Sequence, residues 1–210
     1  MSCVKSQPRS LHPLALGDEV NFRLTYDGPL KAASQSETRR LEKHAIRLVF
    51  SEQLNQLLSH RSDVTEKEWQ NMPWEDFHAM VKKKGDLTFV ALVRGRLNLV
   101  CDLDILFLRR ENPGQLISGG GDIDNRIKVL FDALRIPQDD NEVRGIPPHD
   151  KIIFCLTEDD RLITGFRVTT DRLLEPAPSE HEQNNVRLII DVEIKATKLT
   201  EENLAYFSHF

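Results

Sequence analysis

The sequence has few of the features that mark membrane-spanning, disulfide-stabilised or strongly basic proteins. No apolar run approaches the ~20 residues that span a bilayer, and no charged-then-apolar leader opens the chain, so we expect no secretory signal. Three cysteines at wide and unrelated spacing favour buried thiols in a reducing compartment over a disulfide framework or a zinc site. We therefore expect a cytoplasmic protein without a membrane partner.

Positive charge is outnumbered by negative charge. Lys and Arg number 28 against 33 Asp and Glu, which gives a formal net charge of −5. This balance excludes a protein that covers nucleic acid with a uniformly basic surface. An enzyme that acts on nucleic acid would need a local basic face, or metal ions, to offset its own acidity.

The overall composition is typical of one globular domain. The 210 residues are 40% hydrophobic and 29% charged, and a chain of this length can bury a sizeable core. Residues 1–18 show little periodicity and contain prolines, so we expect an N-terminal arm there. We expect residues 19–210 to form a single domain with a helical insertion at about 62–86.

Hydrophobic periodicity predicts an α+β fold. Apolar and polar side chains alternate from Val20 to Tyr26, as in a half-buried strand that Asp27-Gly28-Pro29 would end. The same reasoning predicts helices at 36–59 and 125–135, and further strands at 87–92, 97–108, 151–156, 162–169 and 186–196. Because strands and helices do not alternate regularly, we expect a mixed β-sheet packed by two main helices.

The expected insertion has helix signals of its own. Pro73 suits a first helical position, Lys82-Lys83-Lys84 a last turn, and Gly85 a stop. The lysine run has two interpretations, which are a solvated helix end favoured by the helix dipole and a patch that contacts phosphate.

The most informative stretch lies between residues 122 and 142. It holds six acidic residues against three basic ones, and the acids are Asp122, Asp124, Asp132, Asp139, Asp140 and Glu142. Like charges in one place cost free energy unless they are neutralised, and Mg²⁺ does this by taking one or two carboxylates with water and substrate phosphate. Helix capping is the competing interpretation for Asp122 and Asp124. Capping does not account for Asp139-Asp140 beyond the helix, nor for Lys128 one turn above Asp124.

Other motifs fail on the same residues. An EF-hand that begins at Asp122 needs glycine at its sixth position and glutamate at its twelfth, where this chain has Ile127 and Ala133. No GxxxxGK[ST], GxSxG or HExxH pattern occurs, and the histidines are scattered.

The stretch resembles the signature of RusA-type Holliday-junction resolvases. Family members typically read D-L-D-N-x-x-K-x-x-x-D-A-L, followed after a short loop by D-D-x-Q-V. Here the first part runs from Asp122 to Leu134 and the second from Asp139 to Val143, with Ile123 in place of leucine and Glu142 in place of glutamine. The strand at 20–26, with its following turn, is similar to the family's first strand and turn.

The resemblance implies a dimeric, Mg²⁺-dependent endonuclease that nicks four-way DNA junctions symmetrically, with Mn²⁺ as a substitute metal. Carried over position by position, the metal ligands would be Asp122, Asp124 and Asp140. Lys128 would lie against the scissile phosphate and stabilise the charge of the transition state. Asp139 would support the ligand set, and Asn125 would act as a cap or beside the ligands.

Candidate contacts to a nucleic-acid backbone are the basic residues near the predicted site loops, namely Lys31, Arg109, Arg110, Arg126, Arg144 and Lys151. For each residue taken alone, a solvated surface charge is the favoured interpretation. Three alternative functions stay open. The first is a nuclease on the same scaffold that cuts flaps, single strands or RNA. The second is a non-catalytic module that binds nucleic acid or protein through Trp69 and Trp74. In the third, the acids are only helix caps.

Overall fold

The strands divide between two mixed sheets. The computed structural model describes residues 19–31, 37–61, 81–110, 123–148, 150–174 and 185–208. In these ranges the four-stranded sheet has the order β1-β7-β4-β6, and its strands are β1 (Glu19–Pro29), β7 (Asn185–Ala196), β4 (Leu99–Arg109) and β6 (Ile163–Arg172). The three-stranded sheet has the order β2-β3-β5, with strands β2 (Val81–Lys84), β3 (Leu87–Val93) and β5 (Ile153–Thr157). Each sheet contains one parallel pair, β4 with β6 and β3 with β5.

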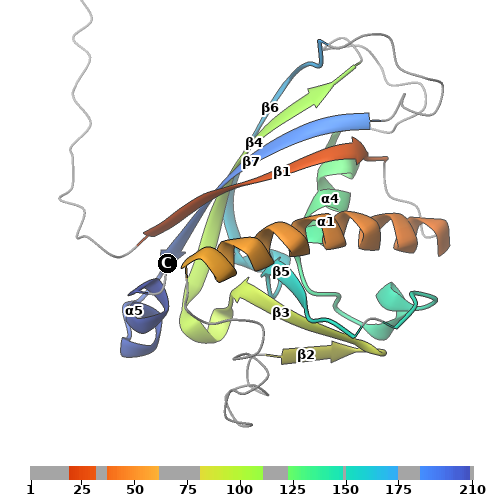
Figure 1. Cartoon of the computed structure of the whole chain (residues 1–210). Coiled ribbons are helices and arrows are strands. Elements are labelled where there is room, and N and C mark those ends of the chain that lie inside the picture. The colour runs from red at the N-terminus through yellow and green to blue at the C-terminus, as the bar shows by residue number, and fades with distance from the viewer. Residues whose placement is uncertain are drawn as a thin grey trace, which may run out of the picture.

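Two helices lie between the sheets. The described α-helices are α1 (Glu37–Arg61), α4 (Ile123–Leu134) and α5 (Glu201–Ser208), and the 3₁₀ helices are η1 (Gly95–Leu97), η2 (Asp140–Val143) and η3 (Asp160–Leu162). In Figure 1 the four-stranded sheet lies above α1, the three-stranded sheet lies below it, and α4 lies behind it. No helix within the described ranges is both long and apolar enough to cross a membrane.

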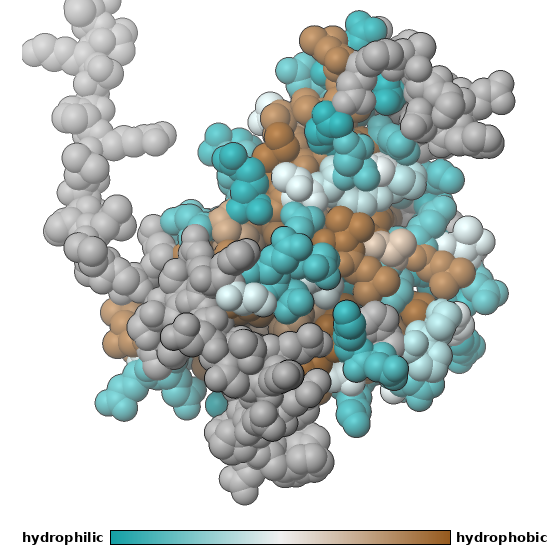
Figure 2. Space-filling model, in the orientation of Figure 1, coloured by the Kyte–Doolittle hydropathy of each residue, from teal (hydrophilic) through white to brown (hydrophobic). Residues whose placement is uncertain are grey.

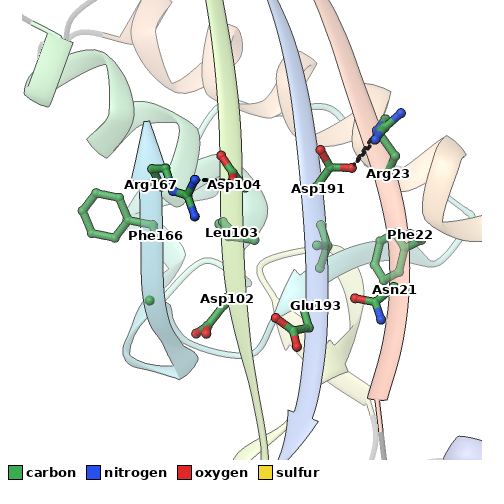
Figure 3. A pocket seen from close by; sticks show the side chains of 12 residues that line it. Asn21, Phe22, Arg23, Asp102, Leu103, Asp104, Phe166, Arg167, Asp191 and Glu193 are labelled. Atoms are coloured by element: carbon green, nitrogen blue, oxygen red, sulfur yellow. Dashed lines mark hydrogen bonds and ion pairs between the residues drawn. The ribbon is translucent and has the colours of Figure 1, made fainter. Parts of the chain in front are cut away.

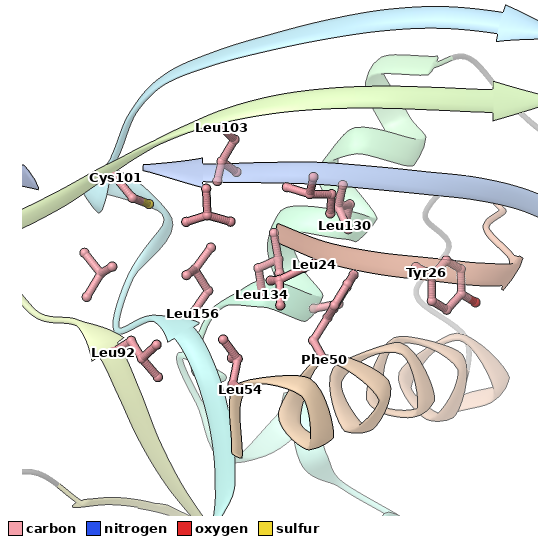
Figure 4. Close-up of a cluster of buried hydrophobic side chains, with 14 of the residues drawn as sticks. Leu24, Tyr26, Phe50, Leu54, Leu92, Cys101, Leu103, Leu130, Leu134 and Leu156 are labelled. Atoms are coloured by element: carbon pink, nitrogen blue, oxygen red, sulfur yellow. The ribbon is translucent and has the colours of Figure 1, made fainter. Parts of the chain in front are cut away.

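The main core fills the space between the two sheets. Helix α1 supplies a stripe at four-residue spacing, Ile46, Phe50, Leu54 and Leu58, all of which are buried. Figure 4 shows Leu103 of β4 on one side of this core, Leu92 of β3 and Leu156 of β5 on the other, and α1 and α4 between them. The outward face of α1 is partly apolar, since Leu41 and Val49 are each 43% exposed, and Figure 2 shows hydrophobic surface gathered over this helix.

A second, smaller core covers the opposite face of the three-stranded sheet. Leu87 and Phe89 of β3 and Cys155 of β5 pack there against Ile136 and Val143. The segment between α4 and β5, which contains η2, is therefore anchored on this sheet by apolar contacts.

The α+β class and most of the predicted elements are confirmed. Helix α1, helix α4 and the strands β3 to β7 lie where periodicity placed them, within a few residues. The expectation of one sheet is replaced by two. Strand β1 continues through Pro29 instead of ending before it, because an edge strand tolerates a residue without an N–H.

Three further differences concern local signals. Lys82 to Lys84 form strand β2 rather than a helix end, and Gly85, at φ +54°, makes the turn of the β2–β3 hairpin. Helix α5 was not predicted, although Thr200 and Asn203 cap it reciprocally through two backbone N–H bonds of 2.9 and 3.3 Å. The predicted arm at 1–18 and residues 62–80 of the predicted insertion lie outside the described residues.

The two core cysteines give a test of this packing. Burial raises the pKa of both Cys101 and Cys155 to about 12, so neither forms the nucleophilic thiolate at about pH 8. We expect a Cys3→Ser variant to resist a maleimide reagent while folded and to label at two thiols after urea unfolding, as counted by mass spectrometry. Rapid labelling of the folded protein would contradict the buried positions of Cys101 and Cys155.

Candidate functional site

Helix α4 exposes the motif side chains of its first two turns. The helix buries Ile127 and Leu130 against the core, so its opposite face points to solvent. Asp124, Asn125 and Lys128 are all exposed on that side, and Asp124 lies in the first turn, where the helix dipole favours a negative charge. Asp124 and Lys128 are four residues apart and are therefore neighbours on the helix surface.

The second acidic pair lies in the turn that begins η2. Asp139 caps this 3₁₀ helix, because its Oδ1 accepts hydrogen bonds from the backbone N–H groups of Asn141 at 2.8 Å and Glu142 at 3.2 Å. Asp140 is exposed, and its Oδ1 accepts a 3.2 Å hydrogen bond from the Gly85 N–H in the β2–β3 turn. Of this pair, Asp139 therefore acts as a cap and Asp140 is presented to solvent.

A buried ionic network fixes this turn to α4. Arg135 Nη2 donates to Asp132 at 2.7 Å and to Glu142 at 3.2 Å, and Lys43 of α1 contacts Asp132 at 3.2 Å. Arg47, also from α1, donates to the Asp132 carbonyl at 2.8 Å. Burial opposes the charge of Arg135, but Glu142 and Asp132 outweigh it and raise the pKa of Arg135.

The backbone of the same turn is held from two sides. Glu142 Oε1 accepts from the Gln138 N–H at 3.1 Å, and Lys84 Nζ donates to the Gln138 carbonyl at 2.6 Å. The position of Asp140 is therefore determined by α4 through Arg135 and by the β2–β3 hairpin through Lys84 and Gly85.

These contacts sort the six acids of the motif. Asp132 and Glu142 are paired with basic side chains inside the protein, and Asp139 is a cap. Asp124 and Asp140 are exposed, and among the described residues neither has a cationic partner within ion-pair distance. Asp122 lies outside the described residues. Asp124 and Asp140 are thus the two described motif acids that are left for an external cation.

The described residues do not by themselves assemble a metal centre. Across the described ranges no three His, Cys, Asp or Glu side chains are grouped so that they could hold a metal ion. In the described part of the chain, no hydrogen bond or ion pair joins Asp124 or Lys128 to Asp139 or Asp140, whose contacts are to Gly85, Asn141 and Glu142. In Figure 1, α4 lies behind α1, and the short coil of η2 lies below one end of α1. The donors nevertheless suit Mg²⁺ chemically, because Asp124 and Asp140 offer exposed carboxylate oxygens.

The basic residues predicted to contact a nucleic-acid backbone differ in their accessibility. Lys31 is paired with Glu42 at 3.6 Å, and Arg144 is exposed and donates to Asn141 at 2.8 Å. Arg110 is half-buried. Arg109 and Arg126 are only 7% and 1% exposed, so these two side chains are not available to a phosphate that approaches from solvent.

A second charged region covers the open face of the four-stranded sheet. The strand register places Asp102 opposite Glu193 and Asp104 opposite Asp191, so four carboxylates line a hollow of about 650 Å³. The sequence alone places Asp102 and Asp104 on one face of a strand, but the opposing acids follow only from the register of β4 and β7.

Every carboxylate of this hollow has a cationic partner. Figure 3 shows Arg23 beside Asp191, at 2.6 Å, and Arg167 beside Asp104, at 3.5 Å. Lys195 bridges the remaining two acids, at 2.9 Å from Asp102 and 3.0 Å from Glu193. The hydrogen bond from Lys195 lowers the pKa of Asp102, with burial acting against it. The open face is therefore a network of surface ion pairs.

Comparisons with known proteins add no relative. No family model matches the chain, and no curated protein or solved structure matches it.

The ionic network predicts a specific loss of stability. Arg135→Met would leave the mostly buried carboxylates of Asp132 and Glu142 without their shared cation, which costs about 3 kcal/mol for a buried pair. We expect a correspondingly lower midpoint of urea unfolding, monitored by circular dichroism.

The matched control is Arg23→Met. It also removes one arginine from an ion pair, but the Arg23 and Asp191 side chains are 62% and 54% exposed, so the midpoint should hardly move. Equal midpoints for the two variants would mean that the buried network contributes no more to stability than an exposed ion pair.

Proposed function

We propose that the chain is a RusA-type, Mg²⁺-dependent endodeoxyribonuclease that resolves four-way DNA junctions by paired symmetric nicks. The observation that carries this proposal is the sorting of the motif acids. Asp124 and Asp140, which match the motif's metal ligands, are exposed and have no cationic partner in the described part of the chain. Asp132 and Glu142, which match its remaining acidic or amide positions, serve the fold.

The proposal assigns a separate role to each motif residue. Asp122, Asp124 and Asp140 would hold the metal through carboxylate oxygens. Lys128, exposed one turn from Asp124, would stabilise the negative charge that develops on the scissile phosphate. Asp139 acts through the backbone, since its cap sets the conformation of the turn that presents Asp140.

Bound Mg²⁺ would polarise a phosphate oxygen and lower the pKa of the attacking water. The protein side chains then have to orient the scissile phosphate and keep other cations away from the carboxylates. This assignment requires no protein nucleophile, and the two described core cysteines are protonated and buried.

Paired nicks require two sites, so the proposed assembly is a homodimer with one site in each protomer. The proposed RusA-like domain spans 19–210, and residues 62–80 of the expected insertion at about 62–86 lie outside the described residues.

Cleavage of a labelled synthetic four-way junction tests the proposal. With Mg²⁺ we expect paired nicks in the junction and none in matched duplex or single strand. Asp124→Asn and Asp140→Asn should each lower the rate by at least about 100-fold, because each removes a charged metal ligand while leaving the side chain's size unchanged. Rates are measured by gel separation of the labelled strands, with Mn²⁺ as a second metal.

Two controls separate metal binding from folding. Asp139→Asn should keep activity within a few fold, because asparagine is as good a cap as aspartate. Asp104→Asn, which removes an exposed carboxylate from the open sheet face, should have no effect. Cleavage of the duplex or single strand alone would support nuclease activity but would reject the four-way junction as the substrate. Tight junction binding without cleavage in any metal would favour a binding module.

A further inference from the structure

A continuous groove lies on the same face of the three-stranded sheet as the Asp139–Asp140 turn. Its wider part is a hollow of about 840 Å³ between β2, the residues after α4 and η3. A narrower part of about 100 Å³ extends it toward η1. The two parts share Lys82, Ile136 and Glu158, so they form one groove.

Basic side chains predominate in this groove. Five line it, namely Lys82, Lys84, Arg94, Arg96 and Arg161. Three carboxylates oppose them, those of Glu158, Asp159 and Asp160. Two ion pairs lie within the groove, Lys82 with Glu158 at 3.3 Å and Arg161 with Asp159 at 2.9 Å, and Arg96 lies 4.0 Å from Glu202 outside it, so two more basic than acidic side chains line the groove. The groove is thus a local positive region on a chain whose net charge is −5.

The strand geometry explains why the lysines point into this groove. Lys82 and Lys84 are two residues apart on β2 and share one face, and they pair with Phe89 and Leu87, which belong to the smaller core on that side. The Lys82 and Arg96 side chains are 51% and 61% exposed, so both can reach a ligand.

The other large hollow has no excess of positive charge. Its four carboxylates, on the open face of the four-stranded sheet, are paired with three cations, Arg23, Arg167 and Lys195, and Figure 3 shows the two arginine pairs. A polyanion is therefore attracted more to the groove than to this face, since phosphate backbones bind where lysine and arginine replace their counterions.

We propose that this groove binds the phosphate backbone of a nucleic-acid strand and leads it to the Asp139–Asp140 turn. Gln138 lines the groove and directly precedes that turn, and Lys84 in the groove donates to its carbonyl, so a strand held there lies next to Asp140. The proposal deepens the nuclease assignment and rests on it for the nature of the ligand.

Binding without metal tests the groove independently of cleavage. The groove variant is Lys82→Gln with Arg96→Gln. Lys84 is left unchanged because its hydrogen bond holds the turn. The matched control is Arg23→Gln with Arg167→Gln, which removes two cations from the open sheet face whose side chains are at least as exposed as those of the groove pair. The dissociation constants for a fluorescent four-way junction and a matched duplex are measured by anisotropy in EDTA, between about 50 and 200 mM salt.

We expect the groove variant to bind both DNAs roughly tenfold more weakly and to lower the slope of log affinity against log salt by about 2. The control pair should bind like the parent. Asp160→Asn removes an exposed acid from the groove and should tighten binding by a few fold. A gain of affinity of this kind cannot result from misfolding.

The outcomes separate the groove from the nuclease. Three results would each reject nucleic-acid binding by the groove. They are unchanged binding by the groove variant, equal losses of affinity in the groove and control variants, and a parent protein that binds neither DNA. If the variants show the expected pattern of binding but the protein cleaves no substrate, nucleic-acid binding by the groove is supported and only the nuclease assignment is rejected.

Discussion

The two sheets are joined through hydrogen bonds that α1 makes to an edge strand of each. Gln53 forms a paired contact with the backbone of Thr25 in β1, accepting from its N–H at 2.9 Å and donating to its carbonyl at 2.7 Å. Two residues earlier, Ser51 accepts a 2.9 Å bond from the Phe154 N–H of β5. Unpaired edge groups are costly when buried and invite aggregation when exposed, so these two side chains satisfy the backbone and fix the spacing of the sheets together.

The candidate site depends on this arrangement because its two parts pack on different sheets. The turn that presents Asp140 packs on the three-stranded sheet through Ile136 and Val143. Helix α4, which presents Asp124, packs into the core beneath the four-stranded sheet. Lys43 and Arg47 of α1 contact Asp132 on α4, and Arg135 connects Asp132 to Glu142 beside the turn. The relative placement of Asp124 and Asp140 is therefore held by Arg135 and supported from α1 by Lys43 and Arg47.

Local patterns were sufficient to predict most of the elements but not their assembly. The buried spacing of Ile46, Phe50 and Leu54 and the alternation along β4 each reflect one face of one element, and such periodicity is legible in a single sequence. The division into two sheets depends on pairings between residues far apart, such as Phe89 with Ile153 and Leu103 with Val192, and no short-range signal encodes these. Lys82 to Lys84 were predicted as a helix end and instead form a strand, because a basic run before glycine is also typical of a helix end.

The same limit applies to the candidate site. The sequence located the acids, but the partners that distinguish Asp132 from Asp124 lie on α1 and in the loop after α4, so their roles could be sorted only in three dimensions.

The net charge of this chain is a poor guide to whether it can bind nucleic acid. A net charge of −5 argues against nucleic-acid binding only if the charge is spread evenly. Here, four acids on the open face of the four-stranded sheet are paired with three cations, whereas five basic side chains line the groove on the three-stranded sheet against three acids. At physiological salt, exposed charges are screened beyond about 8 Å, so a phosphate in the groove interacts mainly with the nearby lysines and arginines. With this distribution, the proposed groove would attract a polyanion more strongly than the open sheet face, and Asp140, one of the two carboxylates left for a cation, lies on the same face of the three-stranded sheet as the groove.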